Sequence, residues 1–295
     1  MKKLAFLLLL ASCKLTLTPQ NLYHMAKGIK DARKDLTPEN EYYVGRSVAT
    51  NLLSRANYKY VEADAYQSGQ LGKTTAYVNA VGNVLAAAAM GNARKDDRPS
   101  PIAGWHFVIV DDDTINAFAA SGGFILVNKG LIKTAQNEDE LAAVLAHEVA
   151  HTVRGHAIGS IKKSRMAGVY KEMLNDTVQL DEAQLGTLTQ AFEGAMTDMI
   201  DSMVVKGYSR DTEFEADRIG LHIMADAGYD PQAFIRFLEQ LDKKMGHATG
   251  TGGFKSTHPA PKDRIAKLKA EAATLAAVKA PAIRTERFQA AVATL

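Results

Sequence analysis

Apolar and polar residues recur at helical spacing along most of the chain. Helix starts and breakers divide the helical part into segments, which we predict at residues 38–65, 69–91, 138–154, 158–174, 177–205, 231–246 and 259–277. Thr37 is the predicted N-cap of the first segment, because Pro38 follows it in the first helical turn. Residues 92–101 are charged and contain two prolines, so they are predicted to form a loop.

The strand signal is confined to one region. Three short runs rich in aromatic and β-branched residues are predicted strands, at Trp105–Val110, Ile115–Ala120 and Phe124–Val127. The acidic run Asp111-Asp112-Asp113 after the first strand is read as a solvated turn, with a Ca²⁺ site as the alternative. We therefore expect an α+β domain that is mostly helical, with a small antiparallel sheet directly before helix 138–154.

Helix 138–154 carries clear signals at both ends. Asn137 is the predicted N-cap, and Glu140 occupies the capping-box position three residues later. Glu138, Asp139 and Glu140 place negative charge in the first turn, where it favours the helix dipole. Gly155 is the predicted stop.

This helix contains the sequence His147-Glu148-Val149-Ala150-His151, an HExxH pattern. Residues four apart lie on one face of a helix, so both imidazoles can reach a single tetrahedral Zn²⁺. Glu148 lies beside the first ligand and can accept a proton from water at the metal. The pattern predicts a zinc hydrolase site.

A catalytic zinc needs a third protein ligand. The extended HExxHxxGxxH pattern is excluded, because Arg154 and Ala157 stand where it requires Gly and His. His156 lies about 140° away from the ligand face if the helix continues, so it is read as a surface or second-shell residue at the helix end.

A later segment supplies a glutamate. Glu213 and Asp217 lie four apart and share a helix face, with Ser209 or Asp211 as the predicted N-cap. Glu213 could bind zinc while Asp217 orients a ligand histidine through its free ring N–H. A solvated acidic helix face is the alternative.

HExxH followed by ExxAD resembles the gluzincin metallopeptidases of the HtpX/CAAX-prenyl-protease-like family, in its soluble periplasmic lipoprotein branch. The resemblance covers about residues 37–270. Further matching segments occur in the family's order: Asn116-Ala117-Phe118, Gly122-Gly123, Asp139-Glu140-Leu141-Ala142, Ser209-Arg210, Gly228-Tyr229-Asp230-Pro231 and Thr257-His258-Pro259. Ser121 and Gly155 depart from the family's usual Pro and basic residue, which affects local loop geometry only.

The resemblance implies a zincin-like fold and one Zn²⁺ per chain, with His147, His151 and Glu213 as the ligands. It implies Glu148 as the general base and Asp217 as the partner of a ligand histidine.

Other roles stay open at this point. His258 matches a loop histidine that reaches the metal or caps the site in some relatives, and a solvent histidine is its alternative. Arg210 or Tyr208 could stabilise the oxyanion. The strand edge with Asn116, Ala117 and Phe118, followed by Gly122 and Gly123, is the expected substrate-binding edge strand, where substrate backbone would pair.

The N-terminus predicts export. Residues 1–12 have a short basic start and a short apolar run, as in a signal peptide. Leu10-Ala11-Ser12-Cys13 resembles a bacterial lipobox, which makes Cys13, the only cysteine, the expected lipid anchor. An ordinary signal peptide that contains a cysteine is the alternative. Residues 13–36 are then a tether, 37–278 the peptidase domain and 279–295 a C-terminal tail. Lys14 after the anchor favours the outer membrane by the same resemblance.

Charge is balanced. Removal of residues 1–12 takes two of the 35 Lys and Arg residues and none of the 33 Asp and Glu residues. No basic run is concentrated in one segment, so nothing predicts nucleic-acid binding. The expected function is a zinc endopeptidase facing the periplasm, with unfolded or misassembled envelope polypeptides as substrates. An envelope-protein chaperone with a shielded zinc site is the alternative.

Overall fold

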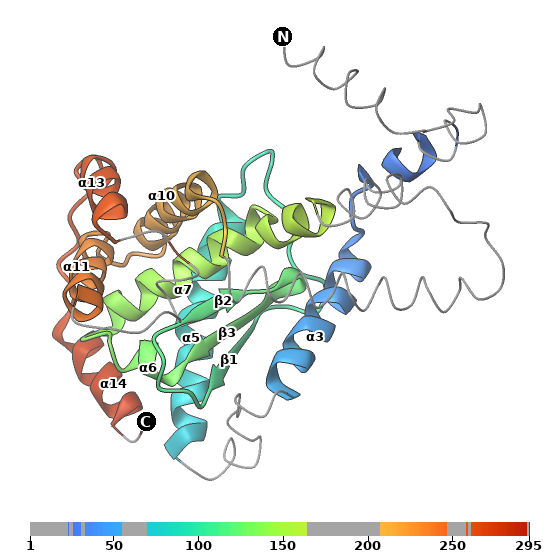
Figure 1. The fold of residues 1–295 in the computed structure, drawn as a ribbon. Coiled ribbons are helices and arrows are strands. Elements are labelled where there is room, and N and C mark those ends of the chain that lie inside the picture. Colours follow the sequence, from blue (N-terminus) through green and yellow to red (C-terminus); the bar gives the residue numbers. More distant parts are fainter. Residues whose placement is uncertain are drawn as a thin grey trace. The chain divides into compact units, whose positions relative to one another are not determined.

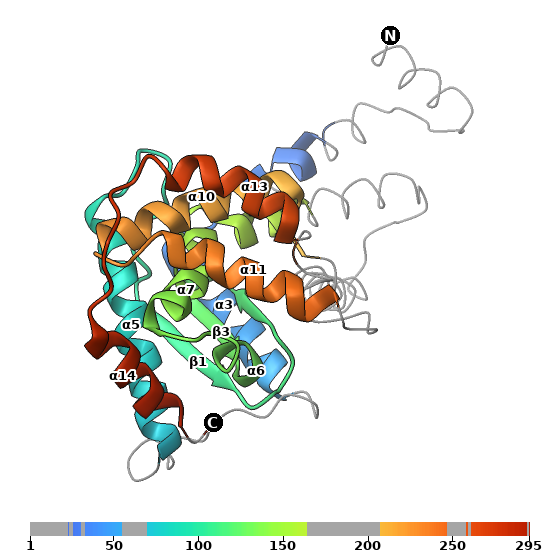
Figure 2. The same ribbon diagram turned by 90° about the vertical axis from the view of Figure 1, so that its left-hand side faces the viewer.

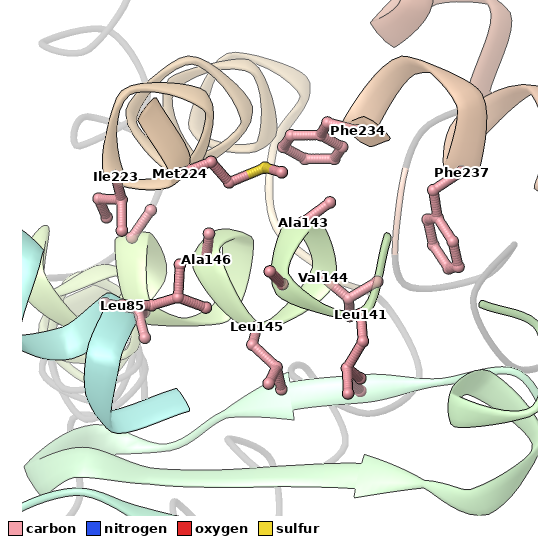
Figure 3. Packing of buried hydrophobic residues seen from close by; sticks show 14 of the residues in the cluster. Leu85, Leu141, Ala143, Val144, Leu145, Ala146, Ile223, Met224, Phe234 and Phe237 are labelled. Atoms are coloured by element: carbon pink, nitrogen blue, oxygen red, sulfur yellow. The ribbon is translucent and has the colours of Figure 1, made fainter. Parts of the chain in front are cut away.

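The HExxH helix, α7 (Glu138–Val153), packs between the sheet on one side and two helices on the other. Figure 3 shows Leu141 and Leu145 pointing toward the strands, while Met224 and Phe234 approach from the opposite side. Within α7, only Thr152 is not buried. Each fully buried leucine contributes about 1.5–3 kcal/mol to folding, so α7 is held firmly in place on both faces.

The computed structural model describes residues 23, 26–30, 33–54, 70–163, 207–246, 258, 261–293 and 295. The elements below lie in one compact unit, Leu36–Ile158 with Ile200–Leu295. In the other unit, Met1–Asp35 with Gly159–Met199, residues 26–30 and 159–163 are helical. The signal peptide, Cys13, the predicted helix 177–205 and the loop Thr249–Gly253 lie outside the described residues. Among the described helices, none has the length and apolarity needed to cross a bilayer.

Most predicted helices are present in the described residues, whereas α6 (Lys129–Ile132) and α14 (Ala282–Val292) lie where no helix was predicted. The other helix bounds are α3 Pro38–Ser54, α5 Gln70–Gly91, α10 Arg210–Asp226, α11 Gln232–Gly246 and α13 Pro261–Ala272. The Thr37 side chain accepts a hydrogen bond from the Asn40 N–H, as expected of an N-cap. The prediction of a mostly helical α+β domain is confirmed.

The sheet is mixed. β1 (His106–Val110) pairs parallel to β3 (Phe124–Asn128), and β2 (Ala117–Ala119) pairs antiparallel to β3, in the order β1-β3-β2. The prediction of an antiparallel sheet is therefore wrong for the β1–β3 pair. A tight turn, Ser121–Gly123, makes β2 and β3 neighbours, so the segment after β1 must cross to the far edge of β3. Asp112 supports that crossing through hydrogen bonds with Thr114 and Gly130.

Both ends of α7 form as predicted, with one difference. The Asn137 side chain accepts from the Glu140 N–H at 3.0 Å. The Glu140 carboxylate bonds to the N–H of Gln136, one residue before the expected capping-box partner. At the other end, Gly155 adopts a φ of 64°, the left-handed conformation in which helices commonly stop.

The C-terminal segment forms a helix that the sequence did not predict. α14 runs beside α5 and reaches the first turn of α7 (Figure 2). Arg287 forms a two-point ion pair with the buried carboxylate of Glu138, which also accepts bonds from two tyrosine hydroxyls, Tyr77 and Tyr229. Arg284 contacts the buried Asp139 at 2.9 Å. The acidic first turn of α7 is thus paired with arginines from α14.

Candidate metal centre

Four buried side chains from three parts of the chain converge beside α7. They are His147 and His151 on α7, Glu213 in the first turn of α10, and His258. One ligand atom from each lies within 4.8 Å of the others. The Nε2 atoms of His147 and His151 are 3.0 Å apart, and the Glu213 oxygens lie 3.6 and 3.5 Å from them.

This donor set fits zinc. Atoms bound tetrahedrally at about 2.0–2.1 Å are separated by about 3.3 Å, close to the three distances above. Glu213 Oε1 is buried and has no hydrogen-bond partner among the described residues. A buried carboxylate oxygen without a donor is costly, and a cation at this position would satisfy it.

α10 is able to bring Glu213 to α7 because the two helices approach closely. A Cβ added at Gly220 would lie 3.1 Å from the backbone nitrogen of His147, tighter than an ordinary contact. Ala216, one turn earlier on α10, is fully buried in the same core. Ser209 caps the helix by accepting from the Thr212 N–H at 3.3 Å, one of the two predicted caps.

His147 is supported by a buried ion pair. Its Nδ1 lies 2.9 Å from Asp217 Oδ1, and Arg264 on α13 binds both Asp217 oxygens. Burial disfavours the charged imidazole, but Asp217 and Glu213 outweigh it and raise the pKa of His147 to about 9. Asp217 therefore lies beside a candidate ligand histidine. Arg264 was missed, because an arginine on a helix with three lysines nearby reads as a solvated residue.

His151 has different neighbours. Tyr208 stacks on its ring at a centroid distance of 4.5 Å, and His156 Nδ1 lies 2.8 Å from its Nδ1. The Tyr208 hydroxyl is buried with no hydrogen-bond partner in the described part of the chain, and burial raises its pKa. His156 thus contacts the ring of a candidate ligand instead of lying on the surface.

His258 lies next to Glu213. Its Nδ1 is 2.5 Å from Glu213 Oε2, and its ring is buried, with 4% of the side chain exposed. This position excludes a solvent histidine. It puts His258 in the cluster as a fourth candidate ligand.

Glu148 is buried on α7 beside the first histidine. Its Oε1 has no hydrogen-bond partner among the residues described. Burial raises the pKa of Glu148, and the nearby His147 and His258 oppose that change. A carboxylate of raised pKa is suited to accept and return a proton near neutral pH.

Arg210 does not join the cluster. Its side chain is 74% exposed and pairs with Asp263 at 3.4 Å. The suggestion that Arg210 stabilises an oxyanion has no support from this placement, since α10 directs Glu213 inward and leaves Arg210 at the exposed helix start.

Only part of the predicted substrate-binding strand, Asn116–Phe118 with Gly122 and Gly123, lies at an edge of the sheet. β2 is an outer strand of the described sheet, and Asn116 directly precedes it. The other outer strand, β1, is covered at Phe107, whose N–H and C=O bond to Asn79. Gly122 and Gly123 lie in the turn after β2, against the backbone of α3 and of Gly104, so their small size serves packing.

Comparison with known proteins decides the family. The model of Peptidase family M48 matches residues 72–272. The chain belongs to Peptidase family M48. The match includes all four cluster residues and Glu148, which confirms the metallopeptidase resemblance found in the sequence, while α14 lies beyond it.

Three M48 relatives show which kinds of protein this chain is similar to. The beta-barrel assembly-enhancing proteases of Yersinia pestis and Escherichia coli are 33% and 30% identical to it over 197 and 198 residues, 65% of this chain in each case. The mitochondrial metalloendopeptidase OMA1 of Schizosaccharomyces pombe is 32% identical over 66% of this chain. The matched region spans 37% of each bacterial relative and 52% of the yeast protein.

Proposed function

We propose that this protein is a zinc-dependent endopeptidase of the bacterial cell envelope. The observation that carries the proposal is the buried cluster of His147, His151 and Glu213, with Glu148 beside it on α7. Two histidines and one glutamate are the ligand set of several zinc peptidases. Membership in Peptidase family M48 supports the same reaction class.

The residues divide the chemistry between them. His147, His151 and Glu213 would hold one zinc ion, and Asp217 would keep the ring of His147 oriented. When bound, zinc supplies Lewis-acid chemistry, acidifying water and polarising the scissile carbonyl. Glu148 accepts the proton and returns it to the leaving amine, a role suited to its buried carboxylate. The backbone of β2 at Asn116–Phe118 is the proposed place for an extended substrate to pair, which reads main chain more than side chain.

His258 is proposed to keep the site latent at rest. Catalytic zinc sites retain an open position, whereas sites with four protein ligands are closed. His258 lies in the cluster at 2.5 Å from Glu213, so it is placed to close the fourth position. A role as oxyanion donor is the alternative, and the two roles predict opposite effects of removing the ring.

Misassembled envelope proteins are the proposed substrates. Two of the relatives are named beta-barrel assembly-enhancing proteases, which supports clients of this kind. A lipid on Cys13, in Leu10-Ala11-Ser12-Cys13, would anchor the protein, with Lys14 favouring the outer membrane. A Cys13→Ala variant is expected to leave the membrane fraction; if it fractionates as the native protein does, the anchor is absent.

A chaperone or assembly factor with a shielded zinc site is the second candidate. The burial of all four cluster residues favours it, because a closed site binds metal without giving a substrate access. A buried glutamate beside the cluster favours the peptidase, since a binding protein needs no proton acceptor.

The Glu148→Gln variant tests the peptidase and separates the two candidates. The amide keeps the size of the side chain but cannot accept a proton, so zinc content should stay at one per chain while cleavage falls by about 10²–10⁴-fold. Bound polypeptides captured on this variant in the periplasm would identify the clients. Cleavage near the native rate would reject Glu148 as the base. Full cellular function without cleavage would favour the chaperone.

A further inference from the structure

The two zinc-ligand histidines of α7 are supported in different ways. His147 contacts the carboxylate of Asp217 directly at 2.9 Å. Among the described residues, no carboxylate lies at hydrogen-bond distance from His151 Nδ1. That atom instead lies 2.8 Å from His156 Nδ1. A metal-binding histidine usually donates its second N–H to an oxygen acceptor. A contact with a ring nitrogen of another histidine is therefore unusual at this position.

The contact depends on how α7 ends. A continuous helix would carry His156 away from the ligand face. Gly155, with a φ of 64°, instead stops α7 and turns the chain, so that His156 lies against His151. The rings meet at a centroid distance of 4.8 Å and an interplanar angle of 76°, which lets the two Nδ1 atoms point at each other.

The protons of this pair can be placed from the distances. The Nε2 of His151 is its cluster atom, 3.0 Å from the Nε2 of His147, so its own proton is on Nδ1. His156 Nδ1 must then accept, which leaves the His156 proton on Nε2. That atom lies 3.5 Å from Glu215 Oε2, which is an electrostatic contact and not a hydrogen bond in this structure.

Glu215 is itself held in place. Its Oε1 accepts from Arg154 Nε at 2.8 Å, and Arg154 also bonds to Asp97 at 3.0 Å. Glu215 lies on α10, two residues from Glu213. Helix α10 therefore carries three residues of the site: the candidate ligand Glu213, Asp217 beside His147, and Glu215 beside His156.

We propose that His156 and Glu215 are positioning residues that fix the tautomer and ring orientation of His151 for zinc binding. The inference rests on the proposed zinc site and adds a support for the second histidine. Stacking by Tyr208 restrains the plane of the ring but supplies no acceptor for its Nδ1 proton.

Zinc affinity of the full-length protein tests this. Zinc dissociation constants are measured by competition with a chelator near neutral pH, and Co²⁺ absorption spectra report the ligand geometry without any activity assay. His156→Ala should weaken zinc binding by about 10–100-fold, the usual cost of losing such a partner, and should alter the Co²⁺ spectrum. His156→Asn, which keeps a polar acceptor near the position of Nδ1, should recover part of the affinity. Glu215→Gln should show a smaller loss in the same direction.

His222→Ala is the matched control. His222 also lies on α10 and also pairs with a carboxylate, Glu271, at 2.6 Å, and none of its hydrogen bonds or ion pairs in the described structure involves a cluster residue. It should leave zinc affinity and the Co²⁺ spectrum unchanged. The metal-free forms are compared by circular dichroism, so that a general loss of structure is recognised.

The outcomes distinguish failure of the positioning role from failure of the proposed zinc site. Unchanged zinc affinity and an unchanged spectrum in His156→Ala would overturn the positioning role, as would an equal loss in His222→Ala. If His156→Ala does not fold, the zinc affinities of His156→Asn and Glu215→Gln test the positioning role instead. A native zinc affinity in Glu215→Gln would overturn the role of Glu215. A native protein that binds no zinc would instead overturn the proposed function.

Discussion

Arg264 binds Asp217 through two hydrogen bonds, Nε to Oδ2 at 2.8 Å and Nη2 to Oδ1 at 2.5 Å. Both side chains are 1% exposed, and the pair spans 47 residues of sequence. Burial opposes ionisation of Asp217, but Arg264 and His147 lower its pKa and keep it charged. Asp217 is thereby kept negatively charged, with its Oδ1 2.9 Å from His147 Nδ1.

Arg264→Met should destabilise the metal-free protein by about 3–5 kcal/mol, because it leaves the buried charge of Asp217 without its partner. The double variant Arg264→Met, Asp217→Leu should recover part of that loss, since neither charge remains. Urea unfolding measures both. Equal stability of the single and double variants would show that the unpaired charge of Asp217 is not what destabilises the single variant. The double variant should still bind zinc more weakly than the native protein, because His147 has lost its acceptor.

Glu213→Ala should abolish stoichiometric zinc binding. Glu213 is the only carboxylate among the four cluster residues, so its removal leaves a buried divalent cation without an anionic ligand. Metal analysis of the purified protein measures the loss. Glu239→Ala is the control, because Glu239 forms an exposed pair with Lys269 and should leave zinc content unchanged. Full zinc content in Glu213→Ala would place the third ligand elsewhere.

His258→Ala should raise basal cleavage of an unfolded polypeptide, because removing the fourth candidate ligand opens the site while three ligands keep the metal. The rate is compared with that of the native protein in a fluorescent peptide assay. A fall in kcat of about 10²–10³-fold would instead favour the oxyanion role. A rate equal to that of the native protein would reject both roles.

Arg287→Met should make the protein more sensitive to acid. Burial alone would raise the pKa of Glu138, but hydrogen bonds from Arg287 and Tyr77 lower it below the usual value of 4.5. A carboxyl group whose pKa is lower in the folded protein than in the unfolded chain stabilises the fold at any pH above the unfolded pKa, here about 4.5. This stabilisation is lost as the pH falls from about 4.5 through the pKa of the folded protein. Without Arg287 the pKa of Glu138 rises, so this contribution is already reduced or absent at neutral pH, and acid unfolding starts from a less stable protein.

The midpoint of acid unfolding, followed by circular dichroism, measures this shift. Lys269→Met is the control, since it breaks an exposed ion pair with Glu239 that screening makes weak. Equal midpoints in Arg287→Met and the native protein would show that α14 does not stabilise the ionised form of Glu138.

Local signals in the sequence were enough for the zinc helix. Its caps, its apolar stripe and the spacing of His147 and His151 all lie within about four turns, and the structure has them as predicted apart from the partner of Glu140. Glu213 and Asp217 were also found as a pair, because residues four apart share a helix face wherever that helix packs. Their approach to α7 was inferred from the family resemblance, and Gly220 supplies the physical reason for it.

Tertiary structure alone decided the rest. Arg264 and the arginines of α14 look like solvated residues in the sequence, and the role of His156 was left open between two positions, yet each meets a buried partner. The direction of β1 depends on which edge of β3 the crossing segment reaches, and strand composition does not encode that choice. Helix caps and i,i+4 spacing act over a few residues and can be read directly. A partner for a buried charge is selected by packing across the whole chain, so it appears only once the helices are in place.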